Sequence, residues 1–193
     1  MATKTVEVYQ IKVMLQDTEP PIWRRLLVPA NMTLQRLHRV LQTVMEWEDC
    51  HLHEFRIGEE LFGPPDPDGW DMGGPPVRSD RTAKLSQVMG WEGAKATYTY
   101  DFGDCWEHEI VVEKILPVEP GLKYPACVAG ELHGPPEDCG GVGGYYDLLE
   151  AIADPEHEDH EQLFDWLGER FDPKEFSVEA ANRKLGGRTR GGG

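Results

Sequence analysis

Apolar and polar residues alternate at several places in the first two thirds of the chain. Residues 5–15 carry apolar side chains at every second position, which predicts a strand with one buried side. Similar runs over 22–28 and 51–57 predict two more strands. Two further runs flank Gly103 and predict a hairpin over 96–116, since glycine supplies the backbone freedom of a tight turn.

Helical spacing of apolar residues occurs early in the chain and dominates its last third. An apolar stripe over 34–47 follows Thr33, which is placed as the N-cap. Further helices are predicted from Tyr145, from Asp154 and over 178–185. Strands followed by helices predict an α+β fold with a mixed or antiparallel sheet, an early packed helix and a C-terminal helical segment.

Glycine and proline interrupt these patterns in two places. Residues 58–80 and 117–144 are rich in both and show no periodicity, so they are predicted as long loops. We expect residues 1–182 to form one domain around both loops. Residues 183–193 hold four basic residues and no acidic one, and we expect them to form a flexible basic tail.

Charge and hydropathy restrict the environment and the partners. The chain has 35 acidic and 19 basic residues, a formal net charge of −16, whereas nucleic-acid binding needs a basic face. The charge therefore argues against a nucleic-acid partner and favours solubility, or affinity for cations or basic partners. No apolar run approaches the roughly 18 residues of a membrane span, and the start resembles no signal peptide. We expect a cytoplasmic protein whose partner is a protein or a small-molecule ligand.

Four cysteines are present, and no pair of them forms a Cys-x-x-Cys motif. A zinc ribbon or a thioredoxin-type motif is therefore not supported. One interpretation is four small buried thiols. Because Cys127 and Cys139 flank one Gly/Pro-rich stretch, the alternative is that these two approach each other as a redox pair or as metal ligands.

Histidines near the predicted strand and hairpin suggest a metal site. His51 and His53 stand two positions apart on a predicted strand, so their rings would point the same way and could bind one ion. Asp104 and His108 lie at the hairpin turn and could reach the same cation. The candidate ligands of a divalent metal ion are thus His51, His53, Asp104 and His108. The alternative is that the histidines support the fold beside Phe55.

The second Gly/Pro-rich stretch contributes two more acidic residues. Glu137 and Asp138 precede a predicted helix, where they would cap it, hold a cation or act as base on a metal-bound water. We expect the polar groups around the hairpin turn to share a cleft with this segment. The candidate cleft consists of Trp23, Arg24, His51, His53, Asp101, Asp104, Trp106, His108, Glu137, Asp138 and Tyr145.

A further set of segments runs in order along nearly the whole chain: Pro21–Arg24, Met45–Trp47, His51–Phe55, Tyr98–His108, Tyr124–Pro125, Pro135–Gly141, Gly144–Tyr145 and Phe171–Pro173. Together these segments resemble the plasmid pRi open-reading-frame-three (ORF-3-like) family. Members are also labelled TnpR-like passenger proteins of insertion elements. The resemblance implies an α+β domain associated with mobile elements and carries over no established activity.

Three functions remain open. The first is a non-enzymatic binding or interaction module whose binding face is residues 58–80 and 124–144, because no complete catalytic signature is present. The alternative is a metal-dependent hydrolase or nuclease that uses the candidate metal ligands. An accessory factor in transposition or site-specific recombination is the second alternative, and it rests on the family label.

Overall fold

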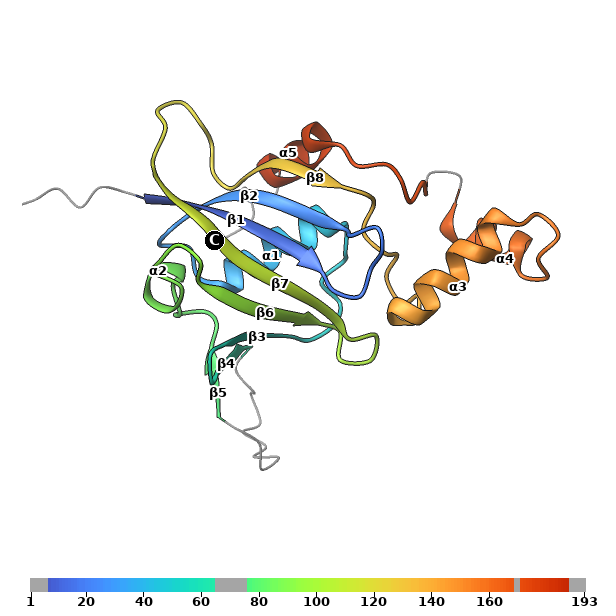
Figure 1. The fold of residues 1–193 in the computed structure, drawn as a ribbon, viewed down its shortest axis with the longest axis horizontal. Coiled ribbons are helices and arrows are strands. Elements are labelled where there is room, and N and C mark those ends of the chain that lie inside the picture. The colour runs from blue at the N-terminus through green and yellow to red at the C-terminus, as the bar shows by residue number, and fades with distance from the viewer. Residues whose placement is uncertain (1–6, 65–75, 169–170, 188–193) are drawn as a thin grey trace, which may run out of the picture.

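The computed structural model describes residues 7–64, 76–168 and 171–187. Its elements are β1 (Glu7–Leu15), β2 (Trp23–Pro29), α1 (Leu34–Met45), β3 (His53–Ile57), β4 (Glu60–Gly63), β5 (Val77–Ser79), α2 (Leu85–Val88), β6 (Lys95–Tyr100), β7 (Trp106–Pro117), β8 (Ala126–Glu131), α3 (Gly141–Ala153), α4 (His160–Leu167) and α5 (Val178–Gly187). The strands form one sheet in the order β5-β4-β3-β6-β7-β1-β2-β8 (Figure 1). Neighbouring strands pair antiparallel, apart from the parallel pair of β4 and β5. The sheet is therefore mixed, and the predicted α+β class is confirmed.

Alternation along the strands gives the sheet one covered face. In β1, Ile11 and Val13 are fully buried, whereas Gln10 and Lys12 are only half-buried on the other side. α1 lies behind the sheet in Figure 1, and α5 contacts both α1 and β8. An antiparallel sheet with one packed and one solvated face produces this pattern, so the core lies between the strands and these two helices.

The start of α1 is as predicted, and its end is earlier. The Thr33 hydroxyl accepts a hydrogen bond from the Arg36 backbone N–H at 3.3 Å, as an N-cap does. The observed helix is capped at Glu46, whose φ of 69° is left-handed, so Trp47, which the prediction included, lies outside it. The Trp47 N–H still bonds to the Gln42 carbonyl at 2.9 Å, which directs the indole into the core, where it is 2% exposed.

Both segments predicted as long loops contain regular structure. β4 and β5 lie within 58–80, of which residues 65–75 are outside the described part, and β8 lies within 117–144. These strands are short and lie among glycine and proline residues, so no period stands out in the sequence. α3 also begins at Gly141, before the predicted start at Tyr145, because glycines carry no side chain that would reveal the helical period.

The C-terminal helices differ from the prediction at one boundary. Asp154 ends α3 instead of starting a new helix, and successive turns separate it from α4, which begins at His160. α5 begins at Val178 as predicted, and it includes residues 183–187 of the expected tail, while 188–193 lie outside the described residues. None of the helices in the described ranges has the length and apolar composition needed to cross a bilayer.

Three imidazoles lie in the core. The rings of His38 and His53 stack with centroids 3.5 Å apart, and His108 is fully buried. Burial lowers the pKa of His108 to about 4. Burial, and then the charge of His53, lowers the pKa of His38 to about 4, and burial also lowers the pKa of His53. All three rings are therefore neutral near pH 7, and charging them opposes folding.

Acid should destabilise this fold through the buried imidazoles. The unfolded rings take up protons near the ordinary pKa of 6.5, whereas a buried ring such as His108 does so only near 4. The contribution of each neutral buried ring to the free energy of unfolding is therefore fully present above pH 6.5. This contribution is lost as the pH falls from 6.5 towards 4. The loss at pH 5 is about 2 kcal/mol for one such ring. Urea unfolding at pH 7 and pH 5 should show a smaller pH-dependent loss for His108→Leu than for the wild type. An equal loss in both proteins would contradict this explanation.

Candidate functional site

A closed ring of hydrogen bonds fixes the loop that follows α1. The Tyr98 hydroxyl donates to His38 Nδ1 (2.8 Å), and the His38 Nε2–H donates to Asp49 Oδ1 (2.6 Å). The Asp49 backbone N–H donates to Gln42 Oε1 (2.9 Å), and Gln42 Nε2 donates to the Tyr98 hydroxyl (3.1 Å). With His38 neutral and its proton on Nε2, every donor in this ring of hydrogen bonds has an acceptor. The two residues after Asp49 are thereby held beside the end of β6.

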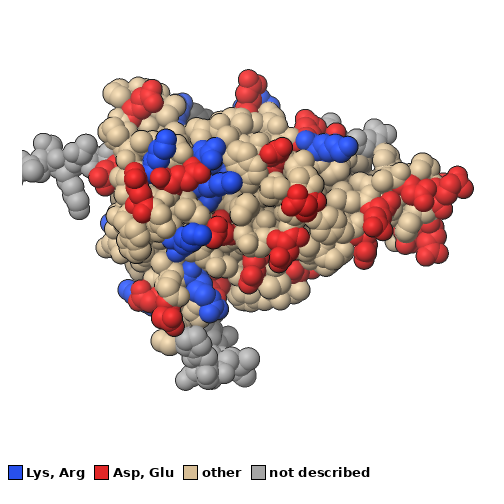
Figure 2. Space-filling view, viewed as in Figure 1, with Lys and Arg blue, Asp and Glu red and all other residues tan. Residues whose placement is uncertain are grey.

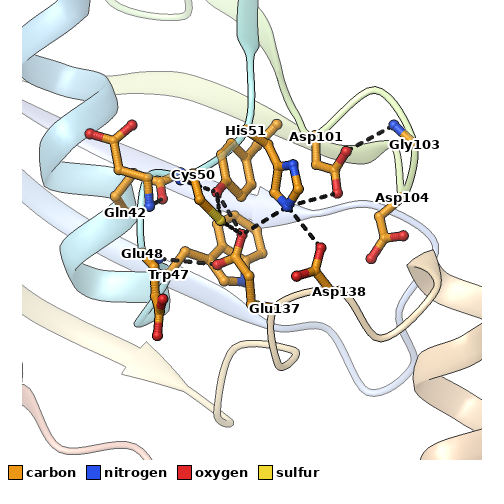
Figure 3. A network of polar contacts seen from close by, with 12 residues as sticks. Gln42, Trp47, Glu48, Cys50, His51, Asp101, Gly103, Asp104, Glu137 and Asp138 are labelled. Atoms are coloured by element: carbon orange, nitrogen blue, oxygen red, sulfur yellow. Dashed lines mark hydrogen bonds and ion pairs between the residues drawn. The ribbon is translucent and has the colours of Figure 1, made fainter.

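The second of these residues, His51, lies among carboxylates from two other segments (Figure 3). Its Nε2 atom is 2.8 Å from Asp138 Oδ1, 3.7 Å from Asp101 Oδ2 and 3.8 Å from Glu137 Oε1. The Cys50 thiol donates to Glu137 Oε1 at 3.4 Å. We refer to Cys50, His51, Asp101, Glu137 and Asp138 as the His51 cluster.

Glu137 is held by groups from two separate elements. The Tyr100 hydroxyl donates to Oε1 at 2.6 Å, and the Glu48 backbone N–H donates to Oε2 at 3.1 Å. Trp47 stacks on the Tyr100 ring with centroids 4.9 Å apart, and its Nε1–H donates to the Pro135 carbonyl at 2.9 Å. The loop before α3 is therefore bound to both the loop after α1 and the end of β6.

Close backbone contacts fix the rest of the loop before α3. The Asp104 carboxylate accepts a hydrogen bond from the Gly140 N–H at 3.0 Å. A Cβ atom on Gly141 would lie 2.5 Å from the Asp104 carbonyl oxygen, and one on Gly144 would lie 2.0 Å from the Cys139 carbonyl oxygen. Both distances are too short for carbon and oxygen. Glycine at these two positions therefore permits the approach that carries Glu137 and Asp138 to His51.

Unusual backbone conformations concentrate around the cluster. Aspartate tolerates left-handed φ values better than most residues, yet they still cost energy. Strain gathered in one place is a recognised mark of a functional region. Four non-glycine residues in or next to the cluster have φ between 54° and 61°: Asp49, Asp101, Cys105 and Asp138.

The carboxylates control protonation in the cluster. Partial burial alone would lower the pKa of His51, but its hydrogen bond to Asp138 and the charges of all three carboxylates raise this pKa. Burial, and then the neighbouring Glu137, raises the pKa of the Cys50 thiol and of the Tyr100 hydroxyl. Cys50 therefore keeps its proton at neutral pH and is a poor nucleophile, because the thiolate is the reactive form.

Two sets of donor atoms converge closely enough to hold a metal ion. One is Cys50, His51 and Glu137, the other is His51, Asp101 and Asp138, and the atoms within each set lie within 4.8 Å of one another. Imidazole nitrogen, thiolate and carboxylate oxygen are the ligands that Zn²⁺ takes in proteins. Within the described residues no Lys or Arg forms an ion pair with these carboxylates, so a bound cation would relieve their mutual repulsion.

The structure brings together His51, Asp101, Glu137 and Asp138 from the predicted cleft, with Asp104 beside them on the hairpin turn (Figure 3). These residues come from three segments far apart in the sequence. The expected meeting of the hairpin turn with the second Gly/Pro-rich segment is thus present in the geometry.

The predicted metal set of His51, His53, Asp104 and His108 is not assembled. β3 begins at His53 and His51 lies before it, so the two rings do not share a strand face. His53 faces the core with Nε2 2.9 Å from Asp80 Oδ2. His108 Nδ1 lies 3.1 and 3.3 Å from two backbone carbonyl oxygens. Both rings therefore support the fold, which is the alternative that the sequence left open.

The other predicted cleft residues lie away from the cluster. Trp106 and Tyr145 are core residues, 1% and 3% exposed. Arg24 is buried under β2, where its Nε–H donates to the Val44 carbonyl at 2.9 Å and burial lowers its pKa to about 10. Trp23 points to the opposite, open face of the sheet, because successive side chains of a strand point to opposite faces.

Sequence reasoning missed Cys50 and Tyr100. The position of Cys50 beside His51 was a usable signal, whereas Tyr100 fits the apolar period of β6 and its hydroxyl gave none. All four cysteines are free, and neither donor set includes Cys127 or Cys139. Within the described part of the chain, those two cysteines therefore form neither a disulfide nor a shared donor set.

Comparison with known proteins identifies the family. The family model described as "Plasmid pRiA4b ORF-3-like protein" matches residues 7–180, and the chain belongs to this family. The chain is 41% identical over 175 residues to "Uncharacterized protein y4hQ" of Sinorhizobium fredii (strain NBRC 101917 / NGR234), covering 91% of this chain and 86% of that protein. It is also similar to the crystal structure of the protein of unknown function MM3350 from Methanosarcina mazei Go1, with a TM-score of 0.81 and 42% identity over 92% of this chain and 97% of that one.

Replacing Gly144 should disturb the loop that carries Glu137 and Asp138. The new methyl group would meet the Cys139 carbonyl oxygen at 2.0 Å, and we expect Gly144→Ala to cost about 1–3 kcal/mol, as overpacking does. Gly143 is the matched control, because its Cβ would meet nothing within 4 Å and alanine favours a helix by roughly 0.5–1 kcal/mol. Urea unfolding of both variants measures the difference, and equal stabilities would contradict the tight approach.

Proposed function

We propose that this protein is a non-enzymatic binding module that holds a divalent transition-metal ion, of which Zn²⁺ fits best, at the His51 cluster. The observation that carries the proposal is the position of His51 Nε2, within 4 Å of carboxylate oxygens from three residues. One imidazolium leaves the three carboxylates with an excess of negative charge. A divalent cation in place of the His51 proton would neutralise them.

The donor chemistry supports zinc over magnesium or calcium. Mg²⁺ and Ca²⁺ take oxygen ligands, whereas both donor sets contain an imidazole nitrogen and one adds the Cys50 sulfur. Binding would displace the proton of His51 and, in the set with Cys50, that of the thiol. Metal affinity should therefore rise with pH, with protons released on binding.

Zinc titration of the protein tests the proposal. Isothermal titration calorimetry of chelator-treated protein should show binding whose affinity increases from pH 6 to pH 8. We expect His51→Asn to weaken zinc binding by at least about ten-fold, because even substitution of a residue that only supports a metal ligand lowers metal affinity by that factor. His157→Asn is the matched control, because His157 is exposed and lies outside both donor sets. Equal affinities of the wild type and His51→Asn would refute a metal site at the cluster.

Metal-dependent hydrolysis is the second candidate function. It is favoured by the count of three donors in each set, which would leave a fourth position of tetrahedral zinc for a reactive water. Asp138 or Glu137, whichever did not ligate, would then be the base. Zinc-dependent turnover of ester or phosphodiester substrates that is lost in His51→Asn would favour this function, whereas zinc binding without turnover favours the module.

An accessory role in transposition or recombination on a mobile element, as the TnpR-like label suggests, ranks third. Such a factor would contact DNA, and a net charge of −16 repels a phosphate backbone. DNA binding that weakens steeply with salt would place this accessory role above the other two functions.

We also propose that residues 1–182 act as one unit and that the protein works in the cytoplasm.

A further inference from the structure

A groove of about 800 Å³ lies between α3 and α4 and begins at Asp138, next to the His51 cluster. Its volume falls in the range of sites that accept ligands or several side chains of a partner. Its apolar part consists of Leu148, Ala151, Leu163 and Trp166. Leu148 and Ala151 on α3 are buried, but Trp166 is 51% exposed. The groove therefore offers a large aromatic surface to solvent.

α4 is a helix without a buried residue. It carries Leu163, Phe164, Trp166 and Leu167, yet none of its residues is buried. α3 and α4 extend together from one end of the sheet, away from the core under α1 (Figure 1). Most amphipathic helices in proteins are stabilised by packing of their apolar face. Leu163 and Trp166, the two apolar residues of α4 that line the groove, are therefore available to a partner.

The charge around the groove is of one sign. Among the residues that the structure describes, five acidic side chains and no Lys or Arg line it; the acidic residues are Asp138, Asp147, Glu150, Glu158 and Asp159. Figure 2 shows acidic side chains gathered at the α3–α4 end of the molecule, while basic side chains lie mainly over the sheet. Such an electrostatic field attracts a basic partner and speeds its association.

We propose that the α3–α4 groove binds a Lys- and Arg-rich amphipathic segment of another protein. An apolar side chain of that segment would pack on Leu163 and Trp166, and its cations would face the acidic rim. A cation over the indole face of Trp166 would add attraction. A second copy of this chain fits poorly, because it would bring a net charge of −16 to the same acidic surface. The proposal does not rest on metal binding at the His51 cluster, with which the groove shares only Asp138.

Fluorescence anisotropy with a labelled synthetic helix, which presents Lys on one face and Leu on the other, tests the proposal. The full chain should bind it, with affinity that falls as salt is added. The same helix with Glu in place of Lys should not bind. A Lys-only peptide should bind at least about ten-fold more weakly, since it has no apolar anchor. No binding of the Lys/Leu helix, or equal binding of the Lys-only peptide, would overturn the proposal.

Matched variants separate the groove from the general acidity of the protein. Trp166→Ala should weaken binding by about ten-fold or more, whereas Phe164→Ala should change it by less than about two-fold, because Phe164 is 49% exposed on the same helix but does not line the groove. Glu150→Lys should likewise weaken binding more than Glu161→Lys, which lies outside the lining. Equal effects within either pair would refute the site. Circular dichroism of each variant checks that the fold is retained.

Discussion

Docking of the loop before α3 onto the end of α1 is the contact on which the His51 cluster depends. A Cβ atom on Gly134 would lie 2.3 Å from the Met45 carbonyl oxygen, so only glycine allows this approach. The Trp47 indole then donates to the Pro135 carbonyl. Two residues further on, Glu137 reaches the hydroxyl of Tyr100 at 2.6 Å. The closed ring of hydrogen bonds around His38 fixes the loop that carries His51, and close glycine contacts fix the loop that carries Glu137 and Asp138. Together they bring the imidazole of His51 next to these carboxylates.

The cost of this arrangement is visible in the backbone and in the charges. Asp101 and Asp138 both have positive φ values, and their carboxylates share the space around His51 with that of Glu137. Strain and like-charge repulsion lower stability and persist where the rest of the structure enforces them. Asp138 also lines the groove between α3 and α4. A metal ion and a basic segment would therefore bind to adjacent parts of one acidic surface.

The sequence predicted the parts of this structure that have a clear periodic pattern, a turn signal or a helix cap. The strand around Ile11, the hairpin around Gly103 and the start of α1 after Thr33 follow from alternation, turn chemistry and capping. β4, β5 and β8 were not predicted, because they lie within the two glycine- and proline-rich stretches, where no alternation stands out. Three of the four predicted metal ligands lie outside both donor sets. His53 and His108 point into the core, because the sequence does not show where β3 begins or which side chains face inward. Asp104 accepts a hydrogen bond from the Gly140 N–H instead.

A zinc-edge anomalous diffraction map of zinc-treated crystals is the most direct test of a metal site in this fold. The convergence of His51 with three carboxylates predicts an anomalous peak within bonding distance, about 2.0–2.1 Å, of His51 Nε2. The other protein ligands of the zinc ion should be Cys50 and Glu137, or Asp101 and Asp138. A well-ordered cluster without a peak, with zinc found only elsewhere on the surface, would contradict it.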